Sequence, residues 1–159
     1  MKKVWMNALE ARTTIVSSRQ NLPHSDAHTR TLMYPYTETT QGVTVTVKPI
    51  YLDGRSSFFS RRFVFAYFIE IRNDNSFGVQ LLHREWLIRN AHGVAETVKG
   101  EGVVGQQPFI ESGKTHRYNS FCVLATFEGT MEGFYSMIDE NGQPFRVAIP
   151  RFSLRAMAN

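Results

Sequence analysis

Three glycines near the middle of the sequence have the spacing of a phosphate-binding motif. Gly100, Gly102 and Gly105 read G-x-G-x-x-G, which in dinucleotide-binding proteins holds a pyrophosphate against the first turn of a helix. That chemistry requires a strand before the glycines and a helix after them. Residues 94–99 have the composition of a strand, but Pro108 and an irregular polar pattern stand where the helix would begin. The glycines therefore predict a loop between strands, not a dinucleotide-binding turn.

Such a loop has two alternative explanations. Its successive backbone amides can form a nest that binds phosphate without a helix, with positive charge added by Lys99, Arg84 or Arg89. Glu101 would repel that phosphate unless a divalent cation bridged them, and Mg²⁺ does bind carboxylate and phosphate oxygens together. In the structural alternative, the glycines adopt positive φ angles or allow a close backbone approach. The missing helix favours the structural alternative. In the phosphate-binding alternative, the candidate ligand-binding residues are Gly100, Gly102, Gly105, Arg84, Glu101 and Lys99.

Two further reactive side chains have structural explanations. Arg84 lies in phase with Leu82 and Trp86, so we expect a buried arginine paired with a carboxylate or stacked on an aromatic ring. Alternatively, strand twist brings its head group to solvent. Cys122, the single cysteine, lies in phase with inward-facing residues, which predicts a buried and inert thiol.

Metal and catalytic motifs are weak. His24, Asp26 and His28 are spaced i, i+2, i+4, but without a third strong ligand we interpret them as chance composition. We find no Gly-x-Ser-x-Gly elbow and no carboxylates whose spacing would bring them together as a pair. We therefore expect a non-enzymatic protein.

Composition limits the partners. The net charge of +4 over 159 residues is spread along the chain, and no Lys/Arg run has the length of a nucleic-acid or membrane tail. Tyr34, Tyr36, Phe58 and Phe59 are predicted to cover the core or an edge and not to stack on bases, so we expect no nucleic-acid partner. No segment has the apolar length of a membrane span. One cysteine and an N-terminus without a long apolar core predict a cytoplasmic protein.

From Gly42 onward the sequence alternates as strands do. Valines at 43, 45 and 47 share one face, and so do Phe63, Phe65, Tyr67, Ile69 and Ile71. The predicted strands cover 43–47, 62–73, 79–89, 94–98, 118–124, 131–137 and 145–149, with Leu82, Trp86 and Ile88 on the inward face of the third.

About seven strands joined by Gly, Asn and Asp turns are typical of an all-β, immunoglobulin-like or fibronectin type III-like antiparallel β-sandwich. We assign residues 41–159 to this sandwich and residues 1–40 to a weakly ordered N-terminal arm with at most a short helix. Trp86 resembles the core tryptophan of immunoglobulin-like folds, and Tyr135 is a candidate corner tyrosine. Pro150 predicts an edge or a bulge in the last strand.

Several blocks together resemble the ApaG family over residues 43–154. They are Phe63-Val64-Phe65-Ala66-Tyr67 with Ile71-Arg72-Asn73; Val79-Gln80-Leu81-Leu82 with Arg84 and Trp86-Leu87-Ile88; Gly100 to Gly105 with Gln107-Pro108; and Gly129-Thr130-Met131, Gly133, Tyr135 and Met137-Ile138-Asp139-Glu140-Asn141-Gly142, followed by Ile149-Pro150 and Phe152. The resemblance implies a fibronectin type III-like sandwich. It also implies an indirect link with cobalt and magnesium resistance or efflux, gene neighbourhood with a diadenosine tetraphosphate hydrolase, and protein-interaction roles in eukaryotic modules.

These observations lead to a ranked expectation of function. First comes a binding module whose loops and sheet edges dock a partner protein. The alternative is a sensor of pyrophosphate or a nucleotide with Mg²⁺ or Co²⁺ at the glycine loop. A phosphohydrolase comes last, because neither a held metal nor a positioned nucleophile is evident. A dimer is compatible with the sequence.

Overall fold

The computed structural model describes residues 35–157, and this part of the chain is built from strands. The predicted all-β class is confirmed. The elements are β1 (Tyr36–Thr40), β2 (Val43–Tyr51), the 3-10 turn η2 (Asp53–Arg55), β3 (Phe63–Asn73), β4 (Val79–Asn90), β5 (Ala95–Glu101), β6 (Phe109–Ile110), β7 (Thr115–Leu124), β8 (Glu128–Asp139) and β9 (Pro144–Arg155). No helix in the described part is long and apolar enough to cross a membrane.

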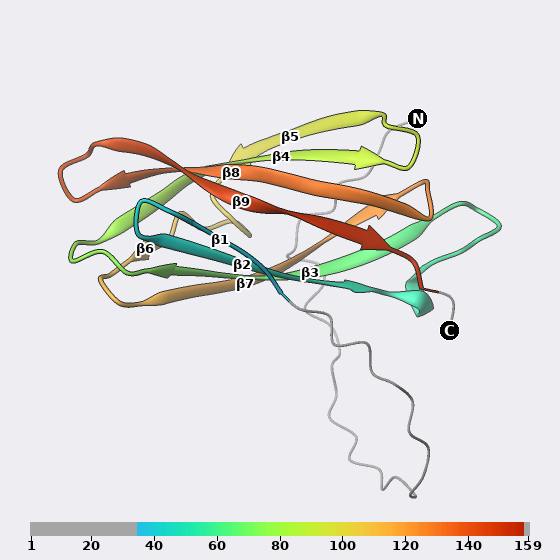
Figure 1. Ribbon diagram of the computed structural model, residues 1–159, viewed down its shortest axis with the longest axis horizontal. Coiled ribbons are helices and arrows are strands. Elements are labelled where there is room, and N and C mark those ends of the chain that lie inside the picture. Colours follow the sequence, from blue (N-terminus) through green and yellow to red (C-terminus); the bar gives the residue numbers. More distant parts are fainter. Residues whose placement is uncertain (1–34, 158–159) are drawn as a thin grey trace, which may run out of the picture.

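Two antiparallel sheets form the predicted sandwich (Figure 1). One has the order β1-β2-β3-β7 and the other β5-β4-β8-β9, with the short β6 also paired to β4. The findings confirm a two-sheet antiparallel sandwich, and its narrower assignment as immunoglobulin-like or fibronectin type III-like stays a prediction.

The inward faces of the two sheets form one core. The alternating residues predicted on β2 and β3 are all buried, because a period of two places every second side chain on the same face. Trp86 on β4 is 3% exposed and packs against Tyr67 of the opposite sheet and against Phe152 of β9 in its own sheet. Its role as a core tryptophan is therefore confirmed.

The β1 strand closes one side of the sandwich. It begins at Tyr36, so residues that the sequence assigned to the arm belong to the sheet, and the boundary predicted at residue 41 is wrong. The Thr40 hydroxyl accepts a hydrogen bond from the Ala148 amide of β9, at 3.1 Å, and so ties the edges of the two sheets together. The rest of the predicted arm lies outside the described residues.

The last strand runs through its proline. Pro150 lies within β9, which is an edge strand, and the pairing of β8 with β9 shifts register between Met131 and Gly133. Both features match the expected edge or bulge, because proline cannot donate to a ladder. The two-residue β6 was not predicted.

A second irregularity lies in β4 and changes which residues face the core. The pairing of β4 with β8 shifts between Leu81 and His83. Leu81 is fully buried, whereas Leu82 is only half-buried, so the prediction that Leu82 shares the inward face of Trp86 is wrong. A bulge inserts one extra residue and reverses the alternation before it.

Candidate functional site

Residues 101–108, which begin at the last residue of β5 and are here called the glycine loop, are hydrogen-bonded to the β4 bulge. The Leu82 carbonyl, which the bulge removes from the ladder, accepts hydrogen bonds from the Gly102 amide at 2.7 Å and from Gln107 Nε2 at 3.0 Å. The Leu81 amide donates to the Pro108 carbonyl at 3.0 Å. The loop thus supplies the partners that β4 lacks between its contacts with β5 and β6.

A tight turn forms the tip of the glycine loop. Val103 and Gln106 pair through two backbone hydrogen bonds, of 2.8 and 3.0 Å, and enclose Val104 and Gly105. Both enclosed residues have positive φ, of 50° and 73°, as a type I′ turn requires. A β-branched residue rarely adopts this conformation, so Val104 is a strained position.

Two of the three motif glycines meet close backbone or side-chain neighbours. Gly102 has a φ of 52°, and a Cβ there would lie 2.0 Å from the Gln106 carbonyl oxygen. A Cβ at Gly100 would lie 2.9 Å from the Arg84 guanidinium nitrogens. With the positive φ of Gly105, the fold accounts for all three glycines without a ligand.

The loop amides are partly occupied. Those of Gly102, Val103 and Gln106 donate to carbonyl groups of the chain. The amides of Val104 and Gly105 have no acceptor among the described residues. An anion at this loop would therefore meet two adjacent free donors, fewer than the extended nest that the sequence allowed.

Arg84 holds the base of the loop. Its Nη1 donates to the carbonyl oxygens of Glu101 and Gly102, at 2.8 and 2.7 Å. These neutral acceptors replace the carboxylate or aromatic partner that the sequence led us to expect. Lys99 Nζ pairs instead with Glu85 at 2.9 Å, and Arg89 lies toward the far end of β4. Of the predicted charged groups, the structure brings only the Arg84 guanidinium against the loop.

A cluster of tyrosines lies between the sheets within the electrostatic reach of Arg84. The hydroxyl groups of Tyr118 and Tyr135 are hydrogen-bonded at 2.5 Å. Burial raises the pKa of Tyr67 to about 12, with the Ser120 side chain and the Arg84 charge opposing part of that rise. Burial also raises the pKa values of Tyr118 and Tyr135 well above their usual range.

This tyrosine cluster was not predicted as a group. The period-two pattern placed each tyrosine on an inward face but could not pair residues from different sheets. Tyr135 bonds to the Tyr118 hydroxyl, and no backbone partner of the kind that defines a tyrosine corner is found among the described residues.

The remaining residues that the sequence singled out for reactivity are a cysteine and three candidate metal ligands. Cys122 is 1% exposed, and burial raises the pKa of its thiol to about 12, which confirms the prediction of a buried thiol. Within residues 35–157 no three His, Cys, Asp or Glu side chains gather in a metal-binding group. His24, Asp26 and His28 lie outside the described residues.

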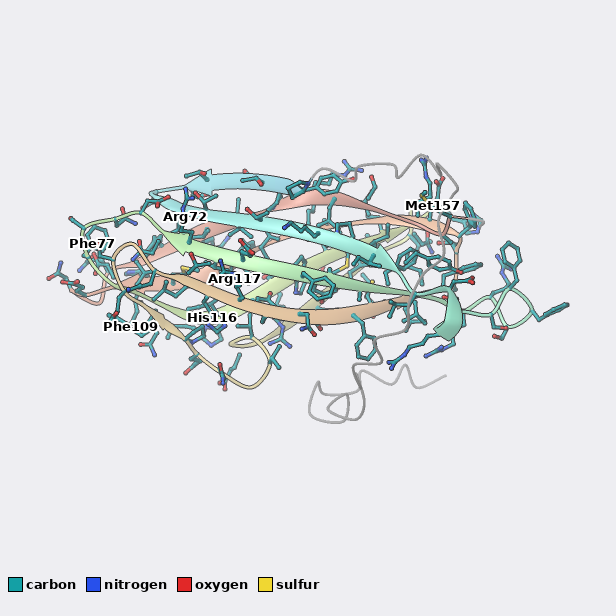
Figure 2. All side chains as sticks on the ribbon, turned by 90° about the horizontal axis from the view of Figure 1, so that it is seen from below. Arg72, Phe77, Phe109, His116, Arg117 and Met157 are labelled. Atoms are coloured by element: carbon teal, nitrogen blue, oxygen red, sulfur yellow. The ribbon has the colours of Figure 1, made fainter. Side chains whose placement is uncertain are left out.

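The outer face of the β1-β2-β3-β7 sheet carries an apolar patch that the sequence analysis did not single out. The outer-face patch consists of Ile50, Ala66, Phe68, Phe121 and Val123. Ile50, Ala66 and Phe121 lie in register across three neighbouring strands. Ile50, Phe68 and Val123 are 47%, 44% and 41% exposed, so the patch is open to solvent. This sheet faces the viewer in Figure 2.

A second exposed apolar group lies at the tip of the hairpin between β2 and β3. Phe58 is 71% exposed and Phe59 is 105% exposed, so the prediction that they cover the core or an edge is wrong for Phe59. Phe58 rests edge-on against Phe63, at 5.4 Å between ring centroids.

Two shallow depressions elsewhere, of about 290 and 340 Å³, have no glycine-loop residue in their linings.

Comparisons with known proteins identify one family. A family model described as the ApaG domain matches residues 54–139. The chain is 49% identical over 116 residues to Protein ApaG of Proteus mirabilis, covering 73% of this chain and 93% of that protein. It is 50% identical over 112 residues to Protein ApaG of Klebsiella pneumoniae, covering 70% and 90%. The crystal structure of an ApaA-designated protein from Bordetella pertussis is similar with a TM-score of 0.70 and 42% identity, over 71% of this chain and 92% of that one.

Proposed function

The chain belongs to the ApaG family, and from that premise we propose that it is a non-enzymatic, cytoplasmic binding module that docks a partner protein on the outer-face patch. The observation that carries this proposal is the exposure of Ile50, Phe68 and Val123 on neighbouring strands of one sheet face. Single exposed apolar residues are ordinary, but a contiguous group across three strands marks an interaction surface.

The energetics of the patch suit a protein partner. Covering a large apolar side chain contributes about 1.5–3 kcal/mol, and buried aromatic residues dominate many interfaces. Phe68 lies between Lys48 and Asn119 in the sheet register, so polar groups flank the apolar centre. An apolar centre with a polar rim is the usual anatomy of an interface.

The neighbouring sheet edge extends the same surface. The patch reaches β7, which is the last strand of its sheet and has no further strand neighbour among the described residues. A partner that covers Phe121 and Val123 can therefore also pair its backbone with the free edge of β7. Such strand addition combines main-chain hydrogen bonds with side-chain specificity.

A quantitative affinity capture tests the proposal. Tagged wild-type protein, the patch variant Phe68→Ser with Val123→Thr, and the control Val94→Thr would be compared in native cytosol after mild cross-linking. Val94 is 64% exposed in the turn between β4 and β5, away from the patch. We expect a discrete protein to be captured by wild type and control and lost from the patch variant. Equal capture by all three would contradict the proposal.

The patch could also join two copies of this chain, and light scattering separates that case. A dimer of the wild type that Phe68→Ser with Val123→Thr converts to monomer would identify the partner as a second copy. The link with cobalt and magnesium resistance implied for the family would, on our proposal, be exerted through the bound protein.

The second candidate function is a sensor of a pyrophosphate-containing nucleotide with Mg²⁺ or Co²⁺. The observation in its favour is the pair of free amides at Val104 and Gly105. Calorimetry with diadenosine tetraphosphate, ATP and pyrophosphate, each with Mg²⁺ or Co²⁺, tests it. Absence of heat at millimolar ligand would exclude this candidate.

A phosphohydrolase is the weakest alternative. Phosphoryl transfer needs a held metal and a positioned nucleophile. Phosphate release that is lost in Glu101→Ala and Arg84→Ala, with folding intact, would support it. Release that survives both changes would come from other residues or a contaminant.

A further inference from the structure

The hairpin between β2 and β3, here called the aromatic hairpin, carries an exposed apolar tip on an ordered backbone. Ser57 and Arg62 pair through two backbone hydrogen bonds, of 2.8 and 2.9 Å, and the Arg61 amide donates to the Phe58 carbonyl at 3.1 Å. The Ser56 hydroxyl bonds to the Leu52 carbonyl and accepts from the Val64 amide. The backbone therefore holds Phe59 outward.

Positive charge surrounds this tip. Residues 53–62 contain three arginines and one aspartate, a net charge of +2. None of the three, Arg55, Arg61 and Arg62, forms an ion pair within the described residues, and Arg62 Nη1 donates to the neutral carbonyl of Arg55. Exposed phenylalanines surrounded by these arginines are complementary to a surface with an anionic outer layer and an apolar interior.

Other exposed apolar groups lie at the same end of the sandwich. Phe127, which is 40% exposed, accepts a backbone hydrogen bond from Ala156, and the adjacent Met157 is 48% exposed. Figure 2 shows Met157 toward the hairpin end, with Phe77 and Phe109 at the opposite end. That opposite end carries the turn Asp139-Glu140-Asn141-Gly142, with Arg72 and Arg117 on the same side of the molecule as Phe77 and Phe109.

We propose that the aromatic hairpin docks this chain reversibly on an anionic phospholipid bilayer, with Phe59 inserted at the headgroup boundary and Arg55, Arg61 and Arg62 among the phosphates. The hairpin projects beyond the end of the two sheets (Figure 1), so its tip can reach into a deformable surface. Aromatic side chains favour the bilayer interface, and arginines near an anionic surface strengthen the attachment. A single small apolar tip gives weak binding that needs both contributions.

Vesicle co-sedimentation of the full chain tests the proposal. Vesicles of phosphatidylcholine alone and with 30% phosphatidylglycerol would be compared, at about 50 and 300 mM salt. We expect binding to the anionic vesicles only, weakened at the higher salt because screening shortens the reach of the arginines.

Three variants separate the contributions. Phe59→Ser should weaken binding about tenfold, because the inserted ring is lost. Arg61→Gln with Arg62→Gln should weaken it about 25-fold, at about fivefold per arginine. The matched control Arg72→Gln with Arg117→Gln removes the same net charge from exposed ion pairs elsewhere and should retain binding.

Each contrary outcome overturns the proposal. Equal binding to anionic and neutral vesicles would exclude docking on an anionic bilayer. Equal loss of binding in the hairpin pair and the control pair would show that only the net charge of the protein matters. Oligomers of the wild type that disappear in Phe59→Ser would assign the tip to a second copy of this chain. Circular dichroism of each variant would show that loss of binding does not reflect loss of fold.

Discussion

The glycine loop and the aromatic hairpin use the same backbone device for opposite purposes. Each is closed by an isolated pair of bridged residues, and each contains a non-glycine residue at positive φ, Val104 at 50° and Arg61 at 48°. In the glycine loop, most backbone polar groups form hydrogen bonds with other groups of the chain. In the hairpin, two aromatic rings and the charges around them remain exposed. A sequence motif is therefore a poorer guide to a binding surface than two structural features: whether the hydrogen-bond donors of a loop are free, and how much apolar side chain it exposes.

The largest effect should come from filling the space at Gly102. A Cβ there requires the strained φ of 52° and meets the Gln106 carbonyl oxygen at 2.0 Å, so Gly102→Ala should lower the free energy of unfolding by about 3 kcal/mol or more. Gly105→Ala is the matched control, because its φ is 73° but its Cβ meets nothing within 4 Å; about 1 kcal/mol is expected. Urea unfolding measures both. Equal losses would break our structural account of the loop.

The next effect should come from Arg84. Replacing it by methionine removes the donor to the Glu101 and Gly102 carbonyls and should lower the free energy of unfolding by about 2–3 kcal/mol. Lysine, a single point donor, should recover only part of this loss. Guanidinium chloride unfolding would measure it. A stable Arg84→Met variant would show that Arg84 is free for another role.

Alkaline pH should act on the tyrosine cluster. The folded pKa of Tyr67 is about 12 against 10 in the unfolded chain, so its contribution is complete below pH 10 and is lost as pH rises toward 12. The loss from Tyr67 should reach about 2–3 kcal/mol, and Tyr67→Phe should flatten the decline. Unfolding followed between pH 9 and 12 measures it. A stability that is constant across this window would contradict the burial of the cluster.

The strain at Val104 should give a small gain. Asparagine tolerates a positive φ better than valine does, so Val104→Asn should raise the free energy of unfolding by about 0.5–1 kcal/mol. Thermal unfolding with matched buffer would register this as a modest rise in Tm. A clear loss of stability would mean that the valine side chain makes contacts worth more than its strain.

The smallest effect should be at the hairpin tip. Phe59 is fully exposed, so Phe59→Ser should change the free energy of unfolding by no more than about 0.5 kcal/mol. The contrast with Gly102→Ala sharpens the comparison of the two loops, because the glycine loop contributes to folding stability and the tip of the aromatic hairpin does not. A substantial loss of stability in Phe59→Ser would remove that contrast.

Periodicity was sufficient for the sandwich but not for its irregularities. The strict alternation of β2 and β3 identified their inward faces, because burial on one face fixes the side-chain period. The bulge at Leu82 could not be read from the sequence, since it is set by how β4 pairs with β8. β1 was missed because Tyr36–Thr40 has no alternation of apolar and polar residues, and the two-residue β6 is too short for a periodic signal.

The backbone form of the glycine loop was predictable only in part, and its role as a site stays a prediction. Pro108 correctly ruled out the helix that a dinucleotide motif requires. The partners of Arg84 were not predictable, because backbone carbonyls at a loop base leave no mark in the sequence. The exposure of Phe59 depends on how far the hairpin projects beyond the sheets, which composition does not encode.

Site-specific photo-cross-linking tests the central claim most directly, that binding uses the outer-face patch and not the glycine loop. A photoreactive phenylalanine analogue would replace Phe68 in one sample and Val104 in another, and both would be irradiated in native cytosol. Phe68 and Val104 are comparably exposed, at 44% and 39%. We predict a discrete protein adduct at position 68 and none at position 104. An adduct at position 104 with none at position 68 would contradict the account.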